Sequence, residues 1–216
     1  MKQNSNKNGV NICHICSNYD KFYIDFMEEQ LLKVSTLKVF YFRAKERGLP
    51  DVKASYLDVR LNYSNWNRPF FLLKEHKILK DFMKLYKNSA FDILHAHTLF
   101  SNGYIAMRAK QKFGIPYIVA VRDMDVNIFF KYRINLRRLG LRILDNADGV
   151  VFISRSYKEE VMNKYIPKYL KSGIDKKSSI IPNGINPFYL DNIYRRKDSP
   201  NPNKITIITV GYVSKR

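Results

Sequence analysis

Polar side chains gather in this sequence directly after short apolar runs. Two histidines end one such run, and an arginine with two aspartates follows the next run along the chain. Such positions offer many hydrogen-bond donors and acceptors, which a ligand with many hydroxyl groups, such as a sugar, requires of its site. The candidate site residues are His95, His97, Ser101, Gly103, Arg122, Asp123, Asp125, Ser154, Arg155, Asn183 and Gly184.

Each of these residues also has a purely structural explanation. His95 could be a hydrogen-bonded core histidine, the serines and aspartates could stabilise helix N-termini, and Asn183 with Gly184 could form a turn. Their joint position is what favours a binding site. The carboxyl ends of parallel strands lie along one edge of a sheet, and such folds bind their ligands there.

Several common catalytic motifs are absent from the sequence. It contains no GxGxxG or GxxxxGK[ST] phosphate loop, no GxSxG nucleophile motif and no HExxH zinc motif. Cys13 and Cys16 form a CxxC, but no second Cys/His pair completes the ligands of a zinc site. Residues three apart on a strand point to opposite faces, so we expect two buried thiols. We expect neither a metal nor hydride-transfer chemistry.

Short apolar runs alternate with amphipathic segments, and this order predicts an α/β fold with a Rossmann-like parallel sheet flanked by helices. The runs are rich in β-branched and aromatic residues, which favour strands. We expect strands at 10–16, 37–42, 52–59, 92–96, 117–121, 149–153 and 178–181, and helices at 25–34, 69–87, 101–113 and 128–144. Gly114 supplies a stop for the third helix.

The chain changes character near its end. Residues 191–203 contain two prolines and a basic run, as a linker does, and residues 204–211 have the pattern of a new strand that ends in glycine. We therefore expect a domain at 1–190, a linker at 191–203 and the first strand of a second domain at 204–216. Because no helix follows this strand, we expect the chain to stop just after the second domain begins.

An ordered series of short motifs resembles the family 4 glycosyltransferases, whose GT-B fold has two facing Rossmann-like domains. The series contains FDILHAH at 91–97, GIPYIVAVRDMD at 114–125, ADGVVFIS at 147–154, IPNGIN at 181–186 and TVG at 209–211. The motifs occur in the order that the family has, from about residue 91 to the end. The resemblance implies that this chain is the N-terminal half of a GT-B fold.

The resemblance also implies a reaction, the transfer of a sugar from a nucleotide-sugar to an acceptor with retention of anomeric configuration. The first domain would hold the acceptor and the second the donor, so we expect this chain alone to be inactive. Arg122 and Asp125 are the expected catalytic residues, and the other candidates would bind substrate. We expect no cofactor, because the nucleotide-sugar is a co-substrate. Many members have histidine at the position of Arg122. The arginine can donate hydrogen bonds, but it cannot act as a base at neutral pH.

The formal net charge of +19 is the unusual bulk property of the chain. It favours an anionic partner, such as a phosphorylated substrate, a membrane surface or nucleic acid. The segment 128–144 carries two apolar stripes and no acidic residue. It suits a helix packed on the sheet with a basic outer face, or one that touches an anionic membrane.

No run approaches the roughly 20 apolar residues that span a bilayer. We expect a cytoplasmic protein of cell-surface polysaccharide or glycolipid synthesis. Its acceptor would be a glycan or lipid-linked sugar, and it would have peripheral contact with the inner membrane face.

Two other functions stay open from the sequence. A basic nucleic-acid-binding domain would explain the charge, but no motif of that class is recognisable and the aromatic residues occupy core-like positions. A non-catalytic domain that binds a sugar or a protein partner would explain the polar strand ends. We favour the transferase and expect no nucleic-acid partner.

Overall fold

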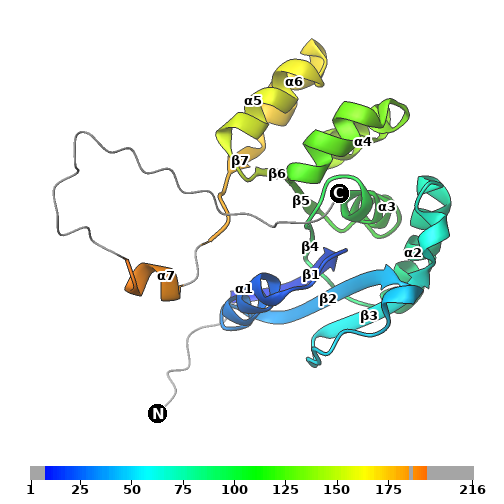
Figure 1. Ribbon diagram of the computed structural model, residues 1–216, viewed down its shortest axis with the longest axis vertical. Helices are drawn as coiled ribbons and strands as arrows, with labels where there is room; N and C mark the ends of the chain where they lie inside the picture. Colours follow the sequence, from blue (N-terminus) through cyan, green and yellow to red (C-terminus); the bar gives the residue numbers. More distant parts are fainter. Residues whose placement is uncertain (1–7, 185–186, 194–216) are drawn as a thin grey trace, which may run out of the picture. The chain divides into compact units, whose positions relative to one another are not determined.

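The computed structural model describes residues 8–184 and 187–193. The chain divides into two units, residues 1–182 and 183–216. In the first unit the strands pair in parallel in the order β3-β2-β1-β4-β5-β6-β7 (Figure 1). The strands are β1 (Asn8–Cys16), β2 (Val34–Ala44), β3 (Leu57–Tyr63), β4 (Ile93–Ala96), β5 (Tyr117–Val121), β6 (Gly149–Phe152) and β7 (Ser178–Ile180).

Helices connect these strands, as the alternating pattern predicts. The α-helices are α1 (Lys21–Leu31), α2 (Phe71–Leu85), α3 (Ser101–Phe113), α4 (Arg137–Asn146), α5 (Arg155–Lys164), α6 (Lys168–Lys176) and α7 (Pro187–Asp191), the last in the second unit. Short 3-10 turns form at Lys45–Arg47, Asn65–Asn67 and Ile134–Leu136, and a π-turn forms at Asp125–Phe130. The parallel α/β fold is therefore confirmed, with the topology of a Rossmann-like domain.

Two hydrophobic clusters cover the two faces of the sheet. The larger contains Cys13 of β1 with buried residues of α2 to α6, and the smaller contains Cys16 with Tyr23 and Met27 of α1. Figure 1 shows α1 beside β1 and β2. Both thiols are free and fully buried, which confirms the prediction for the CxxC, and its two cysteines lie on opposite faces of one strand.

Glycine fixes the end of α3. Gly114 has a φ of 73°, in the left-handed region that favours glycine, and its N–H donates to the carbonyl of Lys110. The helix therefore ends where the sequence predicts, and the chain turns directly into β5.

The predicted helix at 128–144 is wrong as a single element. The chain forms the π-turn up to Phe130, leaves the helical conformation at Arg133 and restarts as α4 at Arg137. The guanidinium of Arg137 donates to the carbonyl oxygens of Phe130 (2.6 Å) and Lys131 (3.2 Å), which a continuous helix would bond internally. The break is thus stabilised by a side chain six to seven residues further on.

Two predicted strands and two unpredicted helices need comment. The strand expected at 52–59 lies at Leu57–Tyr63, because this edge strand follows the alternation of apolar and polar residues rather than the first apolar run. Helices α5 and α6 were not predicted; they are short, at 10 and 9 residues, and each has one buried residue, Val161 in α5 and Ile174 in α6. The strand expected at 204–211 lies outside the described residues.

Candidate functional site

The candidate site begins at the centre of the sheet, where β1 lies beside β4. The chain builds outward from β1 to β3 on one side and continues from β4 to β7 on the other. This reversal is the switch point at which open parallel sheets bind ligands, outside the carboxyl ends of the strands. The residues just beyond β1, β4, β5 and β6 are therefore the ones to compare.

Three histidines form a cluster at this switch point. Nδ1 of His14 on β1 lies 2.9 Å from Nε2 of His97, and the imidazole of His97 stacks on that of His95 with ring centroids 4.2 Å apart. The ring of Phe26 on α1 meets all three imidazoles nearly edge-on, at centroid distances of 5.9 to 6.4 Å. His14 and His97 are buried, whereas His95 is partly buried.

The cluster is uncharged at neutral pH. Burial lowers the pKa of all three imidazoles, and the neighbouring positive charge of Arg122 lowers the pKa of His95 and His97 further. The pKa of His95 falls to about 4. Neutral imidazoles each offer one N–H donor and one nitrogen acceptor, a set that can orient a hydroxyl group.

Neutral histidines are also good metal ligands, and one nitrogen from each of these three lies within 4.8 Å of the others. They are the residues in the described part of the chain that could hold a metal ion. The guanidinium of Arg122 opposes this, because it already places a positive charge beside His95 and His97. The electrostatics therefore suit an anionic or hydroxyl-bearing ligand better than a cation.

Arg122 is held at the end of β5 by contacts with neighbouring elements. Its Nε donates to the carbonyl of His97 (2.9 Å), and its guanidinium lies 5.6 Å from the centre of the Tyr23 ring. Its side chain is partly buried. The structure thus brings Arg122, just after β5, together with His97, just after β4, and with His95, which lies within β4 itself.

Asp125 has a different environment from the one expected of a catalytic acid. One carboxylate oxygen accepts from the backbone N–H groups of Leu99 (3.0 Å) and Arg122 (2.9 Å), and the other from that of Phe100 (3.3 Å). The side chain is only 2% exposed, and burial raises its pKa to about 6 although the three N–H groups pull it down. The carboxylate therefore ties the loop after β4 to the loop after β5.

Ser101 and Gly103 lie in the first turn of α3, and their contacts are structural. Ser101 Oγ donates to Oε1 of buried Glu75 (2.8 Å) and accepts from Lys74 Nζ (3.1 Å), which links α3 to α2. A Cβ atom at Gly103 would lie 2.8 Å from a methyl of Ile143. Glycine is needed there because the helix packs closely against its neighbour.

Asp123, Ser154 and Arg155 lie near the end of β6. Asp123 accepts from the hydroxyl of Tyr157 and from Asn127, each at 2.6 Å, and these bonds lower its pKa. Ser154 caps α5, since its Oγ accepts from the N–H of Tyr157 (3.2 Å). Arg155 is exposed and lines a hollow of about 770 Å³ between α5 and α6. Asp123 and Ser154 thus share Tyr157 of α5 as a partner, whereas Arg155 lines the hollow.

Asn183 and Gly184 belong to the second unit, and both are exposed. Their place in the site stays a prediction.

His14 is the site residue that sequence reasoning missed. It lies inside an apolar run, between Cys13 and Ile15, and carries no motif. The His14 side chain points to the opposite face of β1 from those of Cys13 and Ile15. Only the pairing of β1 with β4 brings it against His97. The strand order of the Rossmann-like fold, applied to the sequence, would have placed the two histidines at one edge.

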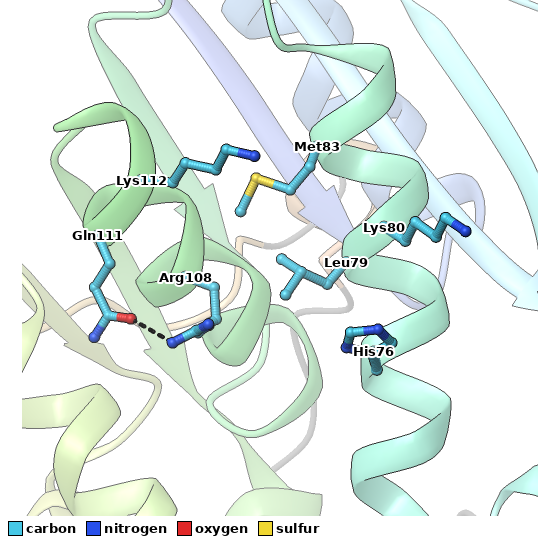
Figure 2. A pocket seen from close by; sticks show the side chains of 7 residues that line it. All are labelled: His76, Leu79, Lys80, Met83, Arg108, Gln111 and Lys112. Carbon is cyan, nitrogen blue, oxygen red and sulfur yellow. Dashed lines mark hydrogen bonds between the residues drawn. The ribbon is translucent and has the colours of Figure 1, made fainter.

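A separate hollow of about 540 Å³ lies between α2 and α3 (Figure 2). Figure 2 shows the hydrogen bond between Arg108 and Gln111 on α3, across the gap from the α2 residues. Nη1 of Arg108 donates to Oε1 of Gln111 at 2.9 Å. Arg108 and Gln111 lie toward the far end of α3 from Ser101, so this hollow is away from the carboxyl edge of the sheet. Its residues are His76, Leu79, Lys80, Met83, Arg108, Gln111 and Lys112.

Comparisons with known proteins bear on the family and the fold of this chain. The family model described as Glycosyltransferase Family 4 matches residues 38–187. An uncharacterized glycosyltransferase of Methanocaldococcus jannaschii is 25% identical over 116 residues, which is 54% of this chain and 29% of that protein. The chain thus matches under a third of the length of this curated relative.

Two solved structures share the fold. Sucrose-phosphate synthase from Thermosynechococcus elongatus matches with a TM-score of 0.54 and 16% identity, over 84% of this chain and 94% of that chain. A UDP-N-acetylglucosamine 2-epimerase matches with a TM-score of 0.53 and 12% identity, over 80% of this chain and 48% of that chain. At such identities these two matches bear on the fold alone.

Proposed function

We propose, from the premise that this chain belongs to the family 4 glycosyltransferases, that it is the acceptor-side domain of a retaining enzyme. The family membership makes it a glycosyltransferase-like domain of the GT-B type. In the proposal, the enzyme moves a sugar from a nucleotide-sugar to a glycan or lipid-linked acceptor. The domain would span 1–190, followed by a linker at 191–203 and the start of a donor-binding domain at 204–216.

The observation that carries this proposal is the cluster of neutral histidines beside one fixed positive charge. The partly buried His95 would offer a donor or an acceptor to a sugar hydroxyl at the switch point of the sheet, and the buried His97 and His14 would orient it from behind. Arg122 brings a guanidinium to the same place, held by its bond to the His97 carbonyl. A ligand with hydroxyl groups and a developing negative charge fits this combination.

The proposed chemistry relies on positioning and on charge. The acceptor hydroxyl attacks the anomeric carbon on the face from which the nucleoside diphosphate departs, and the leaving phosphate takes the hydroxyl proton. The bond from sugar to phosphate breaks as the new glycosidic bond forms. Arg122 would stabilise negative charge on the departing group, since it cannot act as a base. The histidines would orient the acceptor.

Asp125 has a positioning role in this proposal. Its oxygens already accept three backbone N–H groups, one of them that of Arg122. The carboxylate would fix the backbone from which the guanidinium projects. Ser101, Gly103, Asp123, Ser154, Arg155, Asn183 and Gly184 remain proposed substrate-binding residues.

We further propose a place in cell-surface polysaccharide or glycolipid synthesis, at the cytoplasmic face of a membrane. The support is the net charge of +19, which suits an acceptor carried on a lipid phosphate. In the described residues, no helix is long and apolar enough to cross a membrane. We propose no cofactor, with the nucleotide-sugar as co-substrate and no nucleic-acid partner.

The chain contains its own control for a binding test. It has four histidines, three in the cluster and His76 on α2 at the separate hollow. Titration of the isotopically labelled chain with a panel of free glycans should shift the imidazole NMR signals of His14, His95 and His97 and leave those of His76 in place. Nucleotide-sugars should shift none of them strongly, because their main site would lie on the other domain. Shifts confined to His76, or no shift with any glycan, would contradict the proposal.

The prediction that this chain alone is inactive has its own test. The purified 216 residues, incubated with a panel of nucleotide-sugars and acceptors, should release no nucleoside diphosphate. Turnover of any nucleotide-sugar would show that the chain needs no second domain.

A further inference from the structure

Large apolar side chains are exposed on two segments that follow strands β3 and β5. We name these eight residues the apolar rim. They are Trp66, Phe70, Leu72, Leu73, Met124, Ile128, Tyr132 and Ile134, each at least 44% exposed. In the first segment they surround the start of α2, and in the second Met124, Ile128 and Tyr132 recur every four residues, so that they share one side of the turn.

The two segments contact each other although they lie 64 residues apart in sequence. Nη2 of Arg133 donates to the carbonyl of Pro69 at 3.3 Å. Beneath the surface, the ring of Phe71 meets that of Phe129 nearly edge-on, with centroids 5.7 Å apart. The two segments that carry the apolar rim therefore pack against each other.

The apolar rim is mixed with positive charge, and the exposed acids beside it are Asp123, next to Met124, and Glu46, which accepts from the backbone N–H of Asn65. Residues 64–74 and 126–144 contain no aspartate or glutamate, and the second range carries five lysines and arginines. The flanking Glu75 and Asp125 are both buried. Two of the exposed aromatic rings have an ammonium group over them, Lys77 over Trp66 (5.5 Å) and Lys131 over Tyr132 (5.2 Å).

Aromatic, aliphatic and basic side chains together are typical of surfaces that enter the headgroup region of an anionic bilayer. The aromatic rings suit the interface, the aliphatic side chains bury apolar area, and the ammonium groups meet lipid phosphates. A nucleic acid would stack on Trp66 and Tyr132 but would leave Leu72, Leu73 and Ile134 without a partner of like polarity. The composition thus favours lipid over nucleic acid.

The apolar rim also lies at the same edge of the sheet as the candidate site. Both of its segments follow the carboxyl ends of strands, the edge that carries the histidine cluster. We propose that the apolar rim inserts into the interfacial layer of membranes that contain anionic lipid and holds the candidate site against the bilayer surface. This proposal rests on the proposed transfer to a lipid-linked acceptor, which would then reach the site without leaving the membrane.

Trp66 is the only tryptophan in the chain and is 65% exposed, so its fluorescence reports directly on the apolar rim. Phosphatidylcholine vesicles containing phosphatidylglycerol should shift its emission to shorter wavelength, and vesicles with brominated acyl chains should quench it. Vesicles of phosphatidylcholine alone should do so much less, and added salt should weaken the effect. An emission spectrum unchanged by anionic vesicles would overturn the proposal.

A matched pair of substitutions tests the location. Tyr132→Ser and Leu73→Ser should each weaken co-sedimentation with anionic vesicles about tenfold, as expected for one large apolar side chain left out of the bilayer. Tyr169→Ser, at an exposed tyrosine of α6 outside the apolar rim, should bind as the unaltered chain does. All three side chains are exposed, and circular dichroism would verify that each variant is folded. Equal loss in all three would show that the apolar rim is not the docking surface.

The outcomes separate this inference from the proposed function. Vesicle binding without imidazole shifts on glycan titration would keep the membrane surface and remove the acceptor site. Imidazole shifts without any Trp66 response to vesicles would keep the acceptor site and remove the membrane surface. A Trp66 response to a generic RNA oligonucleotide, with none to vesicles, would replace lipid by nucleic acid as the partner.

Discussion

The substitution Asp125→Asn tests how the two loops around the candidate site are held. The carboxylate accepts three backbone N–H groups, from Leu99, Phe100 and Arg122. An asparagine has one oxygen, so its NH2 group would face at least one of these donors. A buried donor left without an acceptor costs about 1–3 kcal/mol. We expect the free energy of unfolding at pH 7 to fall by about that amount.

The pH dependence gives a second and sharper signature. The pKa of Asp125 is raised from 3.8 to about 6, so between these values the native state binds this proton more tightly than the unfolded chain does. The contribution of this group to the free energy of unfolding therefore falls as the pH rises through that window. The total change is about 3 kcal/mol, at about 1.4 kcal/mol for each tenfold change in the protonation equilibrium. Asparagine has no such proton. The difference in the free energy of unfolding between the unaltered chain and Asp125→Asn should therefore be larger at pH 4 than at pH 7.

Urea unfolding followed by circular dichroism from pH 4 to pH 7.5 would measure both effects. Asp51→Asn, at an exposed aspartate before β3, is the control and should follow the profile of the unaltered chain. Parallel pH profiles for the unaltered chain and Asp125→Asn would refute the raised pKa. Equal stability at every pH would refute the claim that this carboxylate ties the loops together.

Three further predictions concern packing, capping and reactivity. Gly140→Ala should cost about 1–3 kcal/mol of stability in thermal unfolding, because the new Cβ would lie 2.8 Å from the ring of Phe100; an unchanged melting temperature would mean that this contact relaxes freely. Ser154→Ala should cost about 1 kcal/mol through loss of the α5 cap, and Ser154→Asp should recover most of it, a recovery that a role other than capping would not produce. Cys13 and Cys16 should not react with a thiol reagent until the chain unfolds, since both are buried and burial raises the pKa of each thiol; rapid labelling of the native chain would contradict their burial.

Local signals predicted some elements to the residue. The helix Ser101–Phe113 and the strand Tyr117–Val121 have the expected bounds, because Gly114 needs its left-handed conformation between them and the strand is uniformly apolar. The burial of Cys13 and Cys16 on opposite faces follows from strand geometry alone. These features depend on a few neighbouring residues, and the sequence displays such residues directly.

Other features depend on contacts that the sequence does not display. The segment 128–144 has the periodicity of one helix, but the Arg137 guanidinium binds the carbonyls at the break. A position just after a strand does not distinguish Arg122, which lies beside the histidines, from Asp125, whose carboxylate is occupied by backbone N–H groups. His14 is a site residue only because β1 pairs with β4.

That pairing has a consequence for how the protein reaches its folded state. His14 and His97 are 83 residues apart, and between them lie α1, β2, β3 and α2. Closing so long a loop costs conformational entropy before any contact repays it, and such distant pairings are slow to form. We expect a partly folded chain to pair β1 with β2, and β2 with β3, well before β4 joins β1. The histidine cluster does not exist until β4 pairs with β1. The NMR signals of its imidazoles would therefore report when this last pairing forms.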